Sequence, residues 1–342
     1  MTLRDIAKAA GVHFSTVSLA MRDHPRLSRA TCKKVQSTAR ELGYVPDPML
    51  ASLANYRLSL RPVEYRATLA WVTAFPERDQ WRRNTIFREQ YEGARARAEA
   101  LGYKLEEFWL CQPGMTARRA SHILRTRNIT GLIIAPLPMA GGVLRLDWPQ
   151  FSAVAIGYSL SSPPLHLVCA HQFRCIRLAL HELAMRGYRR VGLVMLKSSD
   201  DRVDNNWLAG YLVEQYAEGG REHLRPLLLD AWDETSFEAW LLRERPDAVV
   251  SKVPQTLSAL RARGIAVPQD MGVAYLSPMN PGDEHSGVNE NSESVGAAAV
   301  DFVAGMLHRN ERGVPALPHR LLIDGVWIEG RTTRARLVEA TS

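Results

Sequence analysis

The chain has 342 residues, a length that predicts a small module joined to a large domain. Its 46% hydrophobic content is typical of a globular protein, and no uninterrupted apolar run approaches the ~20 residues of a membrane-spanning helix. The net charge is +7, and residues 1–61 alone carry +6, from ten Lys or Arg against four Asp or Glu. Positive charge gathered at one end predicts a module that binds phosphate groups.

Targeting and redox signals favour a protein of the cytoplasm. The N-terminus predicts folded helices and lacks the apolar stretch of a signal peptide, so we expect no export. The cysteines are scattered without zinc-finger spacing, which favours free thiols in a reducing compartment. The four are Cys32, Cys111, Cys169 and Cys175.

Residues 2–45 predict three short helices, of which the first two are joined by the tight turn of a helix-turn-helix. Thr2 is a good N-cap, and Asp5 stands where it completes a capping box. Gly11 breaks the first helix, and a second follows from about Phe14 to Met21. Val17 and Met21 are expected to face inward.

Ser28 is the predicted N-cap of the third helix, which stops at Gly43. A second helix held against two others in this way can lie in the DNA major groove. A solvated helical bundle with no DNA role is the alternative interpretation. The third helix carries Thr31, Val35, Ala39 and Leu42.

Residues 46–61 predict a linker that is helical only in part. Pro46 and Pro48 end the three-helix unit, because the residue before a proline avoids the helical region. The segment that follows is short, so it should fold fully only against a twin in a dimer or against the DNA minor groove. A flexible tether is the alternative.

From Tyr65 onward the pattern alternates between strand and helix. Such alternation predicts an α/β fold with doubly wound parallel sheets covered by helices on both faces. Two successive sets suggest two similar lobes with a cleft between them, and ligands bind outside the carboxyl ends of such strands. The predicted strands are 67–75, 104–110, 131–137, 152–158, 166–170, 191–197, 247–252 and 271–277.

No catalytic motif is complete in this sequence, so we expect neither an enzyme nor a cofactor. GYSLS at 157–161 lacks the second glycine of a nucleophile elbow, and HELAM at 181–185 lacks the second histidine of a zinc-protease helix. Asp200, Asp201 and Asp204 could hold a cation, although a solvated loop is the favoured interpretation. The histidines show no metal-ligand spacing, and no metal site is expected.

The sequence resembles the lactose-repressor (LacI/GalR-type) family of bacterial transcription regulators. TLRDIAKAAGVHFSTVS at 2–18, residues 26–48 and MLASLANYR at 49–57 resemble that family's DNA-binding head and hinge. The resemblance continues more loosely through ITGLIIAPL at 129–137 and RARGIAVPQDMGVAYL at 261–276. Members are mostly homodimers or larger assemblies, and their regulatory domains resemble periplasmic sugar-binding proteins.

The resemblance implies a sequence-specific regulator of transcription, a repressor, that binds a double-stranded DNA operator as a homodimer or higher oligomer. Its effector would be a small molecule, such as a carbohydrate, bound between the two lobes, and no membrane is involved. The implied domains are a helix-turn-helix head at 1–45, a hinge helix or linker at 46–61, and a two-lobed effector-binding and dimerisation domain at 62–342.

Carried over by position, the resemblance places Phe14 and Ser15 where family members read base edges. Thr16 and Ser18 would contact phosphate or the groove wall, and Leu53 would wedge into the minor groove. The full set implied at the DNA is Thr2, His13, Phe14, Ser15, Thr16, Ser18, Leu19, Arg22, Arg26, Ser28, Thr31, Tyr44, Leu50 and Leu53.

The sequence departs from the family at several of these positions. Leu19 stands where the family often has arginine, and an aliphatic side chain cannot make the bidentate guanine contact. Trp207, three residues before Gly210, stands where many members have an arginine for the effector. With two acidic anchors also replaced, the pocket is more apolar, takes a different effector, or takes none. The effector contacts expected are Phe75, Phe87, Trp207 and Ser277.

Trp207 would stack on the effector, or else it packs in a helical core; both interpretations stay open. Two rival functions make predictions that this sequence does not meet. A sugar-binding protein without a gene-regulatory role would have a signal peptide and no basic head. An enzyme fused to a DNA-binding head would need a convergent nucleophile, base or metal set in the cleft.

Overall fold

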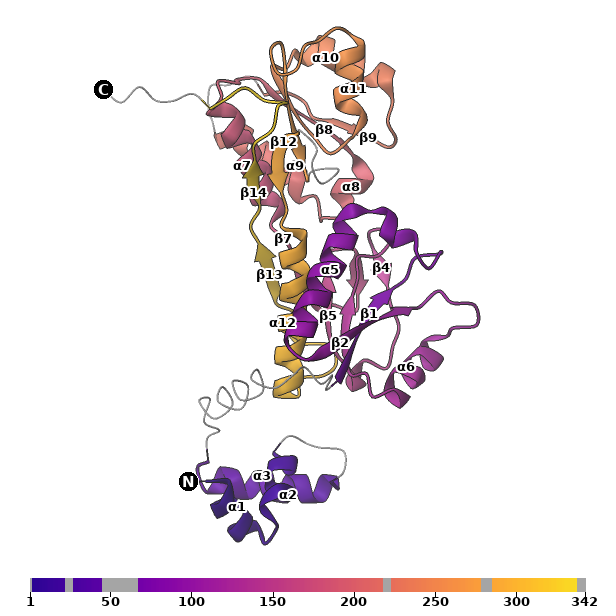
Figure 1. The fold of residues 1–342 in the computed structure, drawn as a ribbon, viewed down its shortest axis with the longest axis vertical. Helices are drawn as coiled ribbons and strands as arrows, with labels where there is room; N and C mark the ends of the chain where they lie inside the picture. Colours follow the sequence, from indigo (N-terminus) through magenta and orange to yellow (C-terminus); the bar gives the residue numbers. More distant parts are fainter. Residues whose placement is uncertain (1, 22–26, 45–66, 218–222, 278–284, 337–342) are drawn as a thin grey trace, which may run out of the picture.

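The computed structural model contains a three-helix head and two α/β lobes (Figure 1). In the head, α1 (Leu3–Ala10), α2 (Phe14–Ala20) and α3 (Arg29–Glu41) pack around one apolar core. Ile6, Val17 and Val35 are completely buried in it. The structure describes residues 2–21, 27–44, 67–217, 223–277 and 285–336.

Short-range hydrogen bonds fix the ends of the head helices as the sequence predicted. The Asp5 carboxylate accepts the backbone N–H of Thr2 at 2.7 Å and its hydroxyl at 3.0 Å. The Ser28 hydroxyl accepts the N–H of Thr31 at 3.2 Å, which caps α3. The Thr31 hydroxyl lies 2.8 Å from that of Ser28, and Cys32, 5% exposed, packs in the core beside it.

The first lobe is built on a six-stranded parallel sheet in the order β13-β7-β5-β3-β1-β2. Helices α5 (Thr85–Ala100) and α12 (Ser292–Arg309) cover one face, and α6 (Ala117–Thr126) covers part of the other. The strands are β1 (Ala67–Thr73), β2 (Tyr103–Trp109), β3 (Gly131–Ile134), β5 (Ser152–Ile156), β7 (His166–Ala170) and β13 (Arg320–Ile323).

The second lobe repeats this plan in the order β14-β12-β11-β10-β8-β9, with β14 antiparallel to β12. Its strands are β8 (Val191–Leu196), β9 (Leu227–Leu229), β10 (Ala248–Ser251), β11 (Gly272–Leu276), β12 (Ser286–Asn289) and β14 (Val326–Ile328). Its helices are α7 (Gln172–Ala184) and α9 (Asn206–Ala217) on one face, and α10 (Glu234–Glu244) and α11 (Gln255–Ala262) on the other.

The chain crosses between the lobes three times, from β7 to α7, from β12 to α12 and from β13 to β14 (Figure 1). Because all three crossings lie together, the lobes are joined by a hinge. Short elements complete the body: η1 (Gln80–Arg83), β4 (Gly142–Val143), η2 (Trp148–Gln150), β6 (Leu160–Ser162) and α8 (Lys197–Asp201).

The predicted α/β class with two doubly wound lobes is confirmed, and every predicted strand is present. The domain boundaries at 45, 46–61 and 62 stay predictions, because residues 45–66 lie outside the described ranges. No helix in the part of the chain that the structure describes combines the length and apolarity needed to cross a membrane.

Candidate DNA interface and ligand site

The first turn of α2 presents an apolar side chain to solvent. Phe14 is 46% exposed, beside the exposed Ser15, while Val17, one turn further along the helix, is completely buried. Leu19 lies half-buried one turn further on. The helix therefore offers a mixed apolar and hydroxyl surface at its N-terminal end, the end that enters the major groove in a helix-turn-helix.

His13 forms the N-cap of α2. Its Nδ1 accepts the backbone N–H of Ser15 at 3.3 Å, and the same atom lies 2.8 Å from the Ser15 hydroxyl. An imidazole therefore supplies the acceptor that a serine or aspartate usually provides, and it orients Ser15 at the same time.

Exposed cations lie on two of the three head helices. Arg4, Lys8, Arg29, Lys33 and Lys34 are all solvent-exposed, on α1 and on the N-terminal half of α3. This places the predicted positive charge on the surface, where it can attract a phosphate backbone.

Several residues implied at the DNA are accessible in the structure. Thr2, His13 and Ser28 are exposed, Thr16 and Thr31 are half-buried, and Tyr44 packs against the head core. Their contact with DNA stays a prediction. The predictions for Arg22, Arg26, Leu50, Leu53 and the Ser18 side chain fall outside what the structure describes.

A buried polar cluster lies where the second lobe meets the hinge. Glu290, 5% exposed, accepts hydrogen bonds from Lys252 Nζ at 3.2 Å, from Gln172 Nε2 at 3.4 Å and from the Ser277 hydroxyl. Lys252, Ser277 and Glu290 directly follow β10, β11 and β12. Gln172 is the first residue of α7. An internal carboxylate and ammonium thus occupy the region where the sequence predicted effector contacts.

Trp207 lies under this cluster and is completely buried. Lys252 Nζ lies 5.0 Å from its ring centroid, which is a cation–π contact. In this conformation neither face of the indole is open to a ligand, so stacking on an effector would require Lys252 to move. Its effector role, like that of Ser277, stays a prediction.

The two predicted phenylalanines lie together in the first lobe, with ring centroids 6.1 Å apart. Arg202 of the second lobe reaches them: its guanidinium lies 5.3 Å from the Phe87 centroid and donates to the carbonyl of Leu137 at 2.5 Å and of Pro138 at 2.6 Å. Phe75 and Phe87 are thus near the lobe junction, and Arg202 bridges it.

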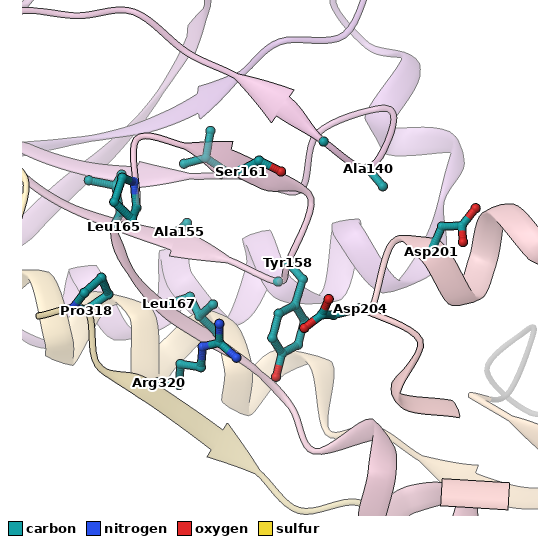
Figure 2. A pocket seen from close by; sticks show the side chains of 14 residues that line it. Ala140, Ala155, Tyr158, Ser161, Leu165, Leu167, Asp201, Asp204, Pro318 and Arg320 are labelled. Atoms are coloured by element: carbon teal, nitrogen blue, oxygen red, sulfur yellow. The ribbon is translucent and has the colours of Figure 1, made fainter. Parts of the chain in front are cut away.

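A cavity of about 440 Å³ opens at this junction, on the face of the first sheet opposite α12 (Figure 2). Tyr158 lies between Arg320 and Asp204, so a cation from β13 and an acid from the second lobe flank one ring. Apolar side chains form the opposite wall. The lining residues are Ala140, Gly141, Ala155, Gly157, Tyr158, Leu160, Ser161, Pro164, Leu165, Leu167, Asp201, Asp204, Pro318 and Arg320.

Burial controls the chemistry of Tyr158 in the cavity wall and of the Cys169 thiol, which is hydrogen-bonded to it. It raises the pKa of Tyr158 well above its usual range, and a hydrogen bond to Cys169 and the charge of Asp204 act in the same direction. Burial likewise raises the pKa of the Cys169 thiol to about 11. Both groups are therefore neutral at physiological pH, and Tyr158 offers a ring and a hydroxyl rather than a phenolate.

Sequence reasoning did not find this cavity. None of the four predicted effector residues lines it, and Asp201 and Asp204 were interpreted as a solvated loop. One signal was available, because Gly157 and Tyr158 directly follow the carboxyl end of β5, where ligands bind in such folds. Among the described residues, no group of three potential metal ligands comes together.

Comparisons with known proteins agree with the resemblance. Residues 2–47 match the model for bacterial regulatory proteins of the lacI family, and residues 180–333 match the periplasmic binding protein-like domain.

Two curated relatives illustrate how the similarity is distributed. The lactose operon repressor of Escherichia coli (strain K12) is 25% identical over 197 residues, 57% of this chain and 51% of the repressor. The transcriptional repressor CytR of the same strain is 44% identical over 48 residues, 14% of each protein. The chain thus matches about half or less of these relatives, most strongly over a short segment.

Solved structures show the same fold over nearly the whole chain. The complex of the transcriptional regulator CelR with cellobiose has a TM-score of 0.58 and 20% identity, and covers 97% of this chain and 99% of that one. The Lac repressor dimer bound to operator and the anti-inducer ONPF has a TM-score of 0.55 and 20% identity, with 98% and 99% covered. At these identities the likeness shows fold alone.

Proposed function

We propose that this chain is a sequence-specific DNA-binding repressor of transcription. Its residues 2–47 match the lacI family of bacterial regulatory proteins, and its residues 180–333 match a periplasmic binding protein-like domain. The observation that carries the proposal is the exposed start of α2 on a head whose other two helices carry exposed cations. The protein would work in the cytoplasm as a homodimer on a two-fold related operator, and it would not be an enzyme.

Selection from a random duplex pool with the full-length chain tests this proposal. We expect palindromic sites, because symmetric protein requires symmetric half-sites. Affinity should fall linearly on a log–log plot against salt concentration, as for any protein that displaces counterions from phosphates. Arg29→Gln removes an exposed cation of α3 and should weaken binding to all DNA sequences by the same factor. Failure to enrich any sequence would contradict the proposal and favour a binding protein without a regulatory role.

We further propose that a small polyhydroxylated effector, such as a mono- or disaccharide, binds in the cavity around Tyr158. Its volume of about 440 Å³ is within the usual range for small-molecule sites. A carboxylate, a guanidinium and a hydroxyl beside an aromatic ring suit a sugar, which has hydroxyls at its edges and apolar faces. Structural relatives have been solved with cellobiose and with D-xylulofuranose, which supports this ligand class.

The cavity suits an effector site because both lobes line it. Tyr158 and Arg320 belong to the first lobe, whereas Asp201 and Asp204 belong to the second. A ligand that contacts all four would bind one lobe arrangement better than another, and this difference is what a regulator needs. The lobe movement would change the spacing of the two heads in the dimer and therefore the affinity for the operator.

Thermal-shift screening of saccharides tests the effector site. Asp204→Asn removes one charge from the cavity. It should therefore reduce the rise in melting temperature that a bound saccharide causes. The matched control is Asp230→Asn, which removes an exposed carboxylate that pairs with Lys197 outside the cavity. Equal responses of the two variants would place the effector elsewhere, with the cluster around Glu290 as the second candidate.

A further inference from the structure

The side chains of α2 limit which DNA bases this helix can recognise. Phe14 is 46% exposed, whereas Ile6, Val17 and Val35 of the head core are completely buried. An exposed phenyl ring contributes little to that core, so its area is available for contact with a partner.

The sequence of α2, FSTVSLA, holds no Arg, Lys, Asn or Gln. These are the side chains that make bidentate hydrogen bonds to guanine or adenine in the major groove. The Ser15 hydroxyl is already paired with the His13 ring at 2.8 Å. The Ser15 and half-buried Thr16 hydroxyls can bond to more than one kind of base, so they discriminate little. The side chains left to discriminate between bases are the exposed Phe14 and the half-buried Leu19, and both are apolar.

Only one base edge in the major groove offers an apolar group, and it is the C5-methyl of thymine. We infer that α2 recognises its half-site through thymine methyl groups, with Phe14 and Leu19 as the residues that read them. This inference rests on the proposed function as a DNA-binding regulator, and it assigns the type of base that the head selects.

The geometry of the helix also indicates how far apart these thymines lie. Helical periodicity puts Phe14 and Leu19 about 140° apart around α2, at the two edges of the surface that faces away from the buried Val17 and Ala20. Five residues span about 7.5 Å of helix at a rise of about 1.5 Å per residue. That length equals about two base-pair steps of roughly 3.4 Å, so the two contacts fall within one half-site.

Deoxyuridine provides the direct test, because it pairs as thymine does but lacks the methyl group. The full-length protein is bound to its selected operator, and each thymine is replaced in turn, symmetrically in both half-sites. At one or two positions, we expect deoxyuridine to weaken binding about fourfold for each methyl group removed. This factor corresponds to the ~0.8 kcal/mol gained when one CH₂ group is buried. Other thymines should tolerate the replacement.

Variants then assign the methyl to a residue. Phe14→Ala should weaken binding to the thymine operator and should lose the difference between thymine and deoxyuridine at one position. Leu19→Ala should do the same at the other position. Because Phe14 is exposed, its truncation should leave the fold unchanged, which circular dichroism verifies. Arg29→Gln is the matched control, since loss of a phosphate contact weakens thymine and deoxyuridine operators by the same factor.

The outcomes separate this inference from the proposed function. Specific binding that no deoxyuridine affects would overturn the inference and leave the regulator intact. A deoxyuridine effect that survives both Phe14→Ala and Leu19→Ala would overturn the assignment to α2. Absence of any selected site would contradict the proposed function itself.

Discussion

Arg202 of the second lobe donates to the backbone carbonyl of Leu137 in the first lobe at 2.5 Å. The same nitrogen donates to the Pro138 carbonyl at 2.6 Å. Burial lowers the pKa of Arg202, and the two carbonyl dipoles offset part of the cost of burying its charge. This side chain is therefore a direct link between the lobes outside the hinge crossings.

Arg202→Met should weaken the closed arrangement of the lobes. Hydrogen bonds from a charged donor contribute about 1.5–3 kcal/mol, so their loss should shift the lobes toward more open forms. Small-angle X-ray scattering should show a larger radius of gyration, and hydrogen exchange should increase around Leu137. Lys197→Met is the control, because it removes a nearby cation whose exposed pair with Asp230 lies within one lobe. An unchanged radius in both variants would show that Arg202 does not hold the lobes together.

Asp200 caps the helix that carries Trp207. Its Oδ1 accepts the backbone N–H groups of Trp207 at 3.1 Å and Leu208 at 3.2 Å. Asp200→Ala should destabilise the protein by about 1 kcal/mol, which is typical of a lost N-cap, and should alter tryptophan fluorescence. Asp200→Asn keeps an acceptor and should stay close to the wild type in urea unfolding. Equal losses in the two variants would argue against capping as the cause.

The amino-acid sequence was sufficient to predict the fold class, because hydrophobic periodicity and helix caps are local signals. Helix α12, by contrast, was not predicted, because its run SESVGAAAVDFVAGMLHR is rich in small and apolar residues without a clear polar face. The structure shows why: Val295, Ala299 and Val300 are completely buried between α5 and the sheet. A helix enclosed in this way lacks the amphipathic pattern on which prediction depends.

The site was harder to predict than the fold. Tyr158, Asp204 and Arg320 line one cavity although they are far apart in the sequence. Their proximity depends on the hinge and on the pairing of β13 with β7, which no local pattern encodes. Phe14 was predictable as a surface residue because it begins α2, but its exposed fraction required the structure.

Gly296 allows α12 to pack directly on α5. A Cβ at this position would overlap the backbone oxygen of Gln90, and one at Gly93 would overlap that of Glu293. Gly296→Ala should therefore destabilise the first lobe by about 3 kcal/mol, since backbone cannot move aside as a side chain can. Gly305→Ala is the control on the same helix, because its Cβ would meet only the flexible Arg309 side chain at 3.0 Å. That control should be neutral or stabilising. Similar unfolding midpoints for the two variants would contradict the packing argument.

Glu89 of α5 provides a pH-dependent test of the hinge. Burial raises its pKa, a hydrogen bond from Ser292 opposes the shift, and the charges of Glu293 and Glu290 add to it. An acid whose pKa is higher in the folded state contributes stability that is fully present below its unfolded pKa of about 4.3. That contribution is lost as the pH rises through the folded pKa, because the buried carboxylate must then ionise.

Glu89→Gln removes this penalty, since glutamine stays neutral. We expect its melting temperature to equal that of the wild type near about pH 4 and to exceed it increasingly toward neutral pH. Glu92→Gln, on the same helix and in an exposed pair with Arg95, should show no such growing advantage. A difference in melting temperature between Glu89→Gln and the wild type that stays constant across this pH range would contradict this prediction. It would mean that the Glu89 carboxylate has the same pKa in the folded and unfolded chains.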